Sequence, residues 1–214
     1  MREKVRRVFG LFAFIFIVWG CYRLIFRLPE NFEELVLKPI FWLGPTFWLV
    51  LKGEKKKLSS LGITSKNFFK SVYLGIGMGM LFALAAALSN YLKYEGFKFR
   101  EFGQNGYSFL LPFLVSFSTA FCEETVFRGY LFNRLKEVLR NEWTANWLTG
   151  ILFVLIHLPI SIFVFHYSLI QLLTYSLLIF IFSLGSAIVF FQTGNIVSSI
   201  LAHVFWSWPI VLFK

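Results

Sequence analysis

The chain has 214 residues, of which 57% are hydrophobic and 29 are phenylalanine, and its mean hydropathy is +0.69. This composition excludes an ordinary water-soluble domain and indicates an integral membrane protein in contact with lipid. Only 15% of the residues are charged, yet the net charge is +10. The positive residues gather between apolar runs, which is typical of cytoplasmic loops and argues against a nucleic acid partner.

Two apolar runs open the chain, over residues 8–26 and 35–51. The first run has the length of a membrane helix, is interrupted by Arg23 and lacks a small-x-small cleavage site. We therefore expect a retained helix and not a signal peptide. Arg23 and Lys38 lie near the ends of the two runs, where long cationic side chains are expected to snorkel toward the lipid headgroups. The acidic link between the runs, with Glu33 and Glu34, is expected on the outer side.

Residues 52–70 contain six lysines. The positive-inside rule places this segment in the cytoplasm, together with the N-terminus. The third helix, over residues 68–92, carries Gly75 and Gly79. Their four-residue spacing lets the backbone of another helix approach closely in a membrane.

A fourth helix is expected over residues 107–128, followed by an amphipathic helix over residues 129–140 that would lie along the membrane surface. Three more apolar segments follow, over residues 143–157, 168–191 and 196–213. The expected fold is all-α: a polytopic transmembrane bundle of about seven helices plus an amphipathic interfacial helix.

The feature that costs most to place in a membrane is the pair Glu123 and Glu124, which follows a long apolar run. Carboxylates within a bilayer must face protein or water, and they are functional candidates. Glu124 and Arg128 are four residues apart and are expected to form an ion pair within their helix. Glu123 points about 100° away from Glu124. Since it has no partner in its own helix, Glu123 is the better catalytic candidate.

Two histidines fall in the later apolar segments. His157 lies four residues after Phe153, and Ser207 lies four residues after His203, so each pair shares one helix face. A single histidine within a membrane often forms a hydrogen bond between helices. Two histidines on separate helices, together with an unpaired Glu123, instead favour a functional site.

Taken in order, the motifs are Glu-Glu-x-x-x-Arg at residues 123–128, Phe-x-x-x-His at residues 153–157 and a further histidine at position 203. This ordered set resembles the CAAX protease and bacteriocin-processing family, also called the Abi or CPBP intramembrane proteases, and is similar to the type II CAAX prenyl endopeptidases. The resemblance covers about residues 109–207. The third motif of the family usually reads His-x-x-x-Asn, whereas position 207 of this chain is Ser.

The resemblance implies a hydrolase that cleaves a peptide bond in a membrane-associated peptide or protein, such as one with a prenylated C-terminus. Glu123 with His157 would activate a water molecule, while His203 and Ser207 would hold the oxyanion. The residues expected to support this site are Glu124, Arg128 and Phe153.

Members of this family are commonly labelled metalloproteases, and Glu123, His157 and His203 could bind zinc with an open fourth position. That arrangement would use up the best base, because the side chain of Glu124 leaves the helix about 100° away. The sequence also lacks a His-Glu-x-x-His segment. We therefore favour a glutamate-based hydrolase that requires no cofactor, with zinc as the alternative.

The expected organisation is a single transmembrane domain over residues 1–214. Residues 1–66 form two N-terminal helices and a basic cytoplasmic loop, and residues 67–214 form the catalytic core. The expected location is the plasma membrane, with the N-terminus in the cytoplasm and the active site opening toward the cytoplasmic side.

Two other functions stay open on sequence grounds. One is a non-catalytic bacteriocin-immunity or scaffold protein, for which Ser207 is the main argument. The other is a small transporter in which Glu123 and the histidines relay protons. No inverted repeat with paired broken helices is recognisable in the sequence, which argues against transport.

Overall fold

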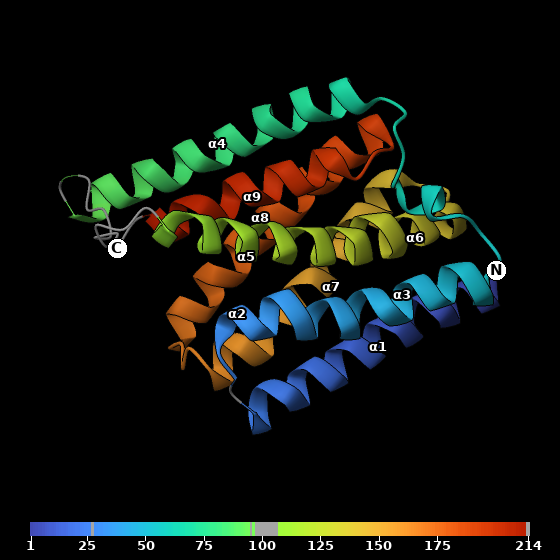
Figure 1. Ribbon diagram of the computed structural model, residues 1–214, viewed down its shortest axis with the longest axis horizontal. Helices are drawn as coiled ribbons and strands as arrows, with labels where there is room; N and C mark the ends of the chain where they lie inside the picture. Colours follow the sequence, from blue (N-terminus) through green and yellow to red (C-terminus); the bar gives the residue numbers. More distant parts are fainter. Residues whose placement is uncertain (27, 95, 97–106, 213–214) are drawn as a thin grey trace.

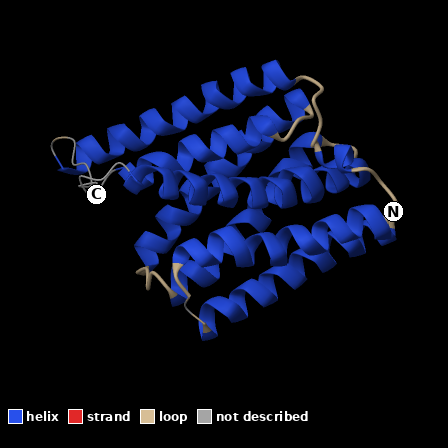
Figure 2. Ribbon diagram, viewed as in Figure 1, coloured by secondary structure: helices blue, strands red, loops and turns tan. Residues whose placement is uncertain are grey.

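The structure is a computed structural model that describes residues 1–26, 28–94, 96 and 107–212. Over these ranges the fold is all-α: helices are joined by short loops, and there is no strand (Figure 2). The expected fold class is thereby confirmed.

The helices are labelled α, and the 3-10 or π-helical segments η. Their order is α1 (Arg2–Ile25), α2 (Glu30–Phe32), η1 (Glu33–Leu37), η2 (Pro39–Leu43), α3 (Gly44–Trp48), η3 (Leu49–Gly53), η4 (Leu58–Leu61), α4 (Phe68–Tyr94), α5 (Tyr107–Glu124), η5 (Thr125–Phe132), α6 (Asn133–Leu139), α7 (Glu142–Phe163), α8 (Leu169–Thr193) and α9 (Val197–Leu212).

Six helices in the described ranges are long and apolar enough to cross a membrane. They are Arg2–Ile25, Glu30–Gly53, Phe68–Leu88, Leu110–Leu139, Glu142–Phe163 and Leu169–Thr193, and a shorter apolar helix covers Val197–Ser207. Together they correspond to the seven expected segments. The last expected segment ends at residue 213, which lies outside the described residues.

Two boundaries differ from the sequence expectation. The second span begins at Glu30, because Glu33 and Glu34 are buried inside the bundle and are not part of an outer link. The fifth span continues through Pro159 to Phe163. Pro159 lacks a backbone N–H donor but does not end the helix. Two residues later, the hydroxyl of Ser161 donates to the carbonyl oxygen of His157 at 2.8 Å.

The amphipathic segment over residues 129–140 does not form a separate surface helix. It continues α5 as part of the helix Leu110–Leu139, and Tyr130 and Phe132 are fully buried. Arg134 is also buried and pairs with Glu54 at 2.7 Å. Arg134 therefore faces a partner within the protein, whereas Glu137 and Arg140 of the same segment are exposed.

The bundle has two parts that meet at α5 and α7 (Figure 1). In one part, α4 lies along α9, and α8 packs against α4, α7 and α9. In the other part, α1 and the helix Glu30–Gly53 run antiparallel as an N-terminal hairpin (Figure 1). The hairpin packs against α5, η5, α6 and α7.

Close contact between α4 and α9 depends on two glycines. A Cβ atom added at Gly75 would lie 2.6 Å from the carbonyl oxygen of Ser198, and one added at Gly79 would lie 2.6 Å from Cβ of Phe205. Any side chain at either position would force the helices apart. The expected role of this glycine pair is therefore confirmed. Gly77, between them, has no atom of another residue within 4 Å of an added Cβ.

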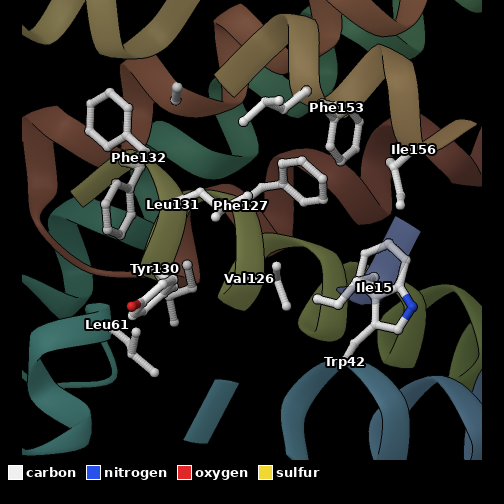
Figure 3. Close-up of a cluster of buried hydrophobic side chains, with 14 of the residues drawn as sticks. Ile15, Trp42, Leu61, Val126, Phe127, Tyr130, Leu131, Phe132, Phe153 and Ile156 are labelled. Carbon is white, nitrogen blue, oxygen red and sulfur yellow. The ribbon is translucent and has the colours of Figure 1, made fainter. Parts of the chain in front are cut away.

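An apolar core joins the hairpin to α5, η5 and α7. Figure 3 shows Trp42 of the hairpin, Val126 and Phe127 of η5, and Phe153 of α7 in one buried cluster. The rings of Phe127 and Phe153 meet edge to face with centroids 4.8 Å apart, a favourable aromatic geometry. Val126 and Phe127 follow Glu123 and Glu124 closely in the chain. Their packing in this core therefore fixes the position of the helices around the two glutamates.

Candidate functional site

Glu123 and Glu124 lie at the last turn of α5, directly before the π-helical segment η5. Irregular turns of this kind occur often at functional sites, since they change the direction of side chains relative to a regular helix. Both glutamates are buried, with 4% and 0% of their surface exposed. Their carboxylates point to different partners and are described separately.

The carboxylate of Glu124 connects three helices. Its Oε2 lies 3.1 Å from Nε of Arg128, which is the expected ion pair, and accepts a hydrogen bond from Ser186 of α8 at 2.7 Å. Its Oε1 lies 2.8 Å from Nδ1 of His203 on α9. Glu124 therefore fixes the ring of His203 as well as balancing the charge of Arg128.

Phe153 supports the side chains around this carboxylate. The guanidinium of Arg128 lies over the Phe153 ring, 4.5 Å from its centroid, which is within the range of a cation–π interaction. The same ring lies 4.7 Å from the ring of His157 and 6.3 Å from that of His203. Phe153 thus contacts both imidazoles as well as Arg128.

The two imidazoles converge on Glu123. Nε2 of His157 and Nε2 of His203 each lie 3.9 Å from Oε2 of Glu123. Nδ1 of His157 lies 2.7 Å from the carbonyl oxygen of Phe153. Because a carbonyl oxygen can only accept, Nδ1 carries the proton in this hydrogen bond, and Nε2 of the neutral ring keeps a lone pair. Nδ1 of His203 likewise carries the proton in its hydrogen bond to Oε1 of Glu124, so Nε2 of the neutral His203 ring also keeps a lone pair.

Oε2 of Glu123 is buried and has no hydrogen-bond partner in the part of the chain that the structure describes. A separation of 3.9 Å is too long for a direct hydrogen bond to either imidazole, but it suits a bridging water molecule. The arrangement therefore places one carboxylate oxygen and two imidazole nitrogens around a common point, where a water molecule could be bound and deprotonated.

Oε1 of Glu123 is held by a residue that the sequence did not suggest. Nζ of Lys38 lies 2.6 Å from it and 2.7 Å from Oε2 of Glu34. Lys38 is only 4% exposed. The expectation that it snorkels to the lipid headgroups is wrong, because two buried carboxylates bind its ammonium group inside the bundle.

The expectation that Arg23 snorkels is wrong for the same reason. Its guanidinium lies 2.6 Å from Glu33 and 3.1 Å from Glu34, and all three residues are buried. A sequence signal for this network did exist: Glu34 and Lys38 have the i,i+4 spacing of an ion pair. The cations Arg23 and Lys38 within the first two apolar runs, together with Glu33 and Glu34 between the runs, could have indicated a buried network.

Glu123, His157 and Ser207 line a pocket of about 350 Å³, together with residues of the hairpin. The exposed residues Glu30 and Phe165 also line it. Both lie at the end of the bundle where α1 ends and α7 meets α8 (Figure 1). The expectation of a site opening toward the lysine-rich segment is therefore not met, because that segment lies at the opposite end, beyond the buried side chains of η5.

Ser207 lines this pocket, but its hydroxyl is engaged elsewhere. It donates to the carbonyl oxygen of Val204 at 3.1 Å and contacts the hydroxyl of Ser116 on α5. Ser116, which the sequence did not single out, lines the same pocket. The residue at position 207 is therefore a serine whose hydroxyl is paired with that of Ser116.

The three side chains proposed as zinc ligands do not fit a zinc ion as they are placed. Within the described ranges, no group of three His, Cys, Asp or Glu residues is arranged to hold a metal ion. The 3.9 Å separations from Oε2 of Glu123 to the two imidazole nitrogens exceed the spacing of roughly 3.4 Å between neighbouring ligands of tetrahedral zinc. Lys38 also places a positive charge on the same carboxylate.

Residues 105–209 match the family model described as type II CAAX prenyl endopeptidase Rce1-like. The match covers just under half of the chain, from α5 into α9, and includes the candidate residues Glu123, His157, His203 and Ser207. The N-terminal hairpin with Lys38 lies outside it. Comparisons with curated proteins and with solved structures give no match. The match confirms the family resemblance: this integral membrane protein carries an Rce1-like domain, the domain of the type II CAAX prenyl endopeptidases, at residues 105–209.

Proposed function

We propose that this protein is an intramembrane endopeptidase that hydrolyses a peptide bond near a membrane-anchored or prenylated C-terminus. The observation that carries the proposal is the free Oε2 atom of Glu123, which faces Nε2 of both His157 and His203 inside the Rce1-like domain. A buried carboxylate oxygen without a hydrogen bond is costly. A bound water molecule would satisfy it and would also be the nucleophile of a hydrolase.

In the proposed mechanism, Glu123 is the general base. A water molecule between Oε2 of Glu123 and Nε2 of His157 gives one proton to the carboxylate, and its oxygen attacks the peptide carbonyl carbon. The proton then passes from Glu123 to the leaving amine when the carbon–nitrogen bond breaks. His157 accepts the second hydrogen bond of the water molecule and holds it in place for the attack.

The developing oxyanion requires hydrogen-bond donors. His203 is the proposed first donor. When Nε2 of its ring is protonated, the imidazolium is balanced by Glu124, which holds Nδ1. The hydroxyl of Ser207 would be the second donor after turning from the carbonyl of Val204. Both donors belong to α9, so one helix would present them together.

We propose that the reaction needs no metal ion. The spacing of Glu123, His157 and His203 and the ion pair between Glu123 and Lys38 support this proposal. Adding a chelator to the purified protein is expected to leave cleavage unchanged. Complete loss of cleavage that is restored by zinc would overturn the metal-free mechanism and would favour these three residues as ligands.

The test of the function is cleavage of a membrane-proximal reporter peptide, prenylated or acylated, by purified protein in detergent. Glu123→Gln keeps the shape of the side chain but removes the base, so kcat is expected to fall by about a hundredfold or more. Glu142→Gln is the matched control, since Glu142 is partly exposed at the start of α7, pairs with Lys136 and does not line the pocket. Equal rates for wild type and Glu123→Gln would contradict the proposal.

A second candidate is a non-catalytic immunity or scaffold protein with the same domain. The observation that favours it is the engagement of Ser207 with Ser116 and Val204, which leaves one proposed oxyanion donor turned away. The same assay separates the two functions. If the protein is a scaffold, wild type and Glu123→Gln would bind the reporter with equal affinity, and neither would cleave it.

A further inference from the structure

The N-terminal hairpin, formed by α1 and the helix Glu30–Gly53, lies outside the segment that matches the family model. It nevertheless contacts the proposed base directly. Nζ of Lys38 lies 2.6 Å from Oε1 of Glu123, across 85 positions of the sequence. Lys38 also lines the same pocket as Glu123 and His157.

We propose that Lys38 is a positioning residue of the active site: it holds Oε1 of Glu123 and thereby directs Oε2 toward the two histidines and the bound water. This inference rests on the proposed role of Glu123 as general base. It makes the hairpin a part of the catalytic unit and not merely an anchor attached to it.

The geometry around Glu123 supports this role. A carboxylate that acts as a base must keep one oxygen free and aimed at the water molecule. Among the described residues, Lys38 is the only hydrogen-bond partner of this carboxylate, since both imidazoles lie 3.9 Å from Oε2. Without Lys38, the carboxylate could rotate about its terminal torsion, which is broad and roughly two-fold in glutamate.

Lys38 is itself held in place. Its ammonium group lies between Oε1 of Glu123 and Oε2 of Glu34. Glu34 is fixed in turn by the guanidinium of Arg23 at 3.1 Å and by the hydroxyl of Thr119 at 2.7 Å. A lysine side chain is flexible in isolation. Here the ammonium group of Lys38 is held between two carboxylates, and one of them, Glu34, is fixed by its own partners.

The same network connects the hairpin to the helix that carries the base. Thr119 lies on α5, four residues before Glu123, and donates to the Glu34 side chain. Ser118, its neighbour, donates to the backbone oxygen of Glu34 at 2.7 Å. The hairpin is thus bound to α5 one turn from Glu123, so that Lys38 and Glu123 are kept at a fixed separation.

A purely structural role would not need this placement. Buried ion pairs contribute little net stability, because removing two charges from water costs about as much as their attraction returns. Besides Glu34, Lys38 pairs with Glu123, whose second oxygen has no hydrogen-bond partner among the described residues. The chemical consequence of the pair is therefore the orientation of Glu123.

The test compares Lys38→Met and Lys38→Arg with Lys52→Met in the reporter assay. Lys52 lies on the same membrane-spanning helix but is exposed and remote from the pocket. Lys38→Met is expected to lower kcat at least tenfold with KM changed less than twofold, because the base loses its orientation while the binding surface remains. Lys38→Arg keeps the charge and is expected to recover part of kcat. Lys52→Met is expected to match wild type.

Folding is separated from catalysis by a second measurement that needs no activity. Thermal unfolding of Lys38→Met, Glu123→Gln and the double variant forms a double-mutant cycle. If the residues act on each other, the shifts in Tm of the single variants will not add up to that of the double variant. Additive shifts would overturn the pairing, whether or not the protein cleaves the reporter.

The outcomes distinguish this inference from the proposed function. Cleavage by wild type that is equally fast in Lys38→Met would overturn the positioning role and leave the function of Glu123 standing. A wild-type protein that cleaves no reporter would contradict the proposed function, and the cycle would then decide the pairing on its own. A fall in kcat that Lys38→Arg partly restores, with Lys52→Met unaffected, supports the inference.

Discussion

Glu123 and Glu124 are neighbours in the chain, yet they have different partners. Glu124 binds Arg128, Ser186 and His203 and has 0% of its surface exposed. Glu123 binds Lys38 through one oxygen and leaves the other without a partner in the described ranges. This division follows from helix geometry, which separates adjacent side chains by about 100°.

At the scale of single residues, we predict that Arg128→Met destabilises the protein strongly. The substitution leaves the carboxylate of Glu124 buried with less compensation, and breaking such a pair costs roughly 3–5 kcal/mol. Thermal unfolding in detergent measures the effect. Arg6→Met is the control, because Arg6 is exposed near the N-terminus. An equal Tm for the two variants would show that Arg128 is not needed to compensate Glu124.

The sequence predicts local contacts at this scale but not distant ones. The pair of Glu124 and Arg128 could be predicted because an i,i+4 spacing is enough to bring two side chains together. The pair of Lys38 and Glu123 could not, because it depends on how the hairpin packs against α5. Ser116 was missed for the same reason: it meets Ser207 only where α5 and α9 cross the pocket.

At the scale of helices, the four-residue spacing of Gly75 and Gly79 in α4 corresponds to a close contact with a neighbouring helix. Gly75 and Gly79 face α9, whereas Gly77 points into open space. The spacing indicated a close approach to another helix but could not identify α9 as the partner. That information depends on the order of all the spans in the bundle.

We predict that Gly75→Ala and Gly79→Ala each destabilise the bundle by about 1–3 kcal/mol, because an added methyl group overlaps α9 at 2.6 Å. Gly77→Ala is the matched control in the same helix and is expected to be neutral or slightly stabilising. Thermal unfolding of the three variants measures these effects. Equal destabilisation at all three positions would mean that loss of backbone freedom, and not contact with α9, controls the result.

The segment over residues 129–140 illustrates the limit of amphipathic patterns. Charged and apolar residues alternate there with a helical period, which fits a membrane surface as well as a protein interior. The structure places Arg134 beside Glu54, and Gly129 against Leu61. Arg134 is therefore turned to protein while Glu137 and Arg140 are exposed, a distinction that periodicity alone cannot make.

For the whole molecule, the direction in which the helices run determines which end of the bundle carries the positive segments and which end the pocket reaches. The N-terminus and residues 52–70 lie at one end of the bundle, whereas the pocket reaches exposed residues at the other end (Figure 1). Positive loops favour the cytoplasm. The pocket is therefore expected to open toward the outer face of the membrane.

We predict that a membrane-impermeant thiol reagent labels Asn31→Cys in intact cells but labels Ser59→Cys only after lysis. Asn31 lines the pocket at its exposed end, and Ser59 is exposed in η4, beyond Gly53. Both cysteine variants are made in the Cys21→Ser protein, because Cys21 is exposed and would itself react, whereas Cys122 is buried. The reverse pattern would place the pocket mouth on the cytoplasmic side.

We predict that this protein cleaves membrane-associated chains with Glu123 as its base. The most direct measurement compares the protein termini in membranes that contain wild type, Glu123→Gln or neither protein, with newly formed termini labelled and sequenced by mass spectrometry. New termini close to membrane anchors are expected with wild type alone. The same new termini with Glu123→Gln, or no difference among the three membranes, would contradict the account.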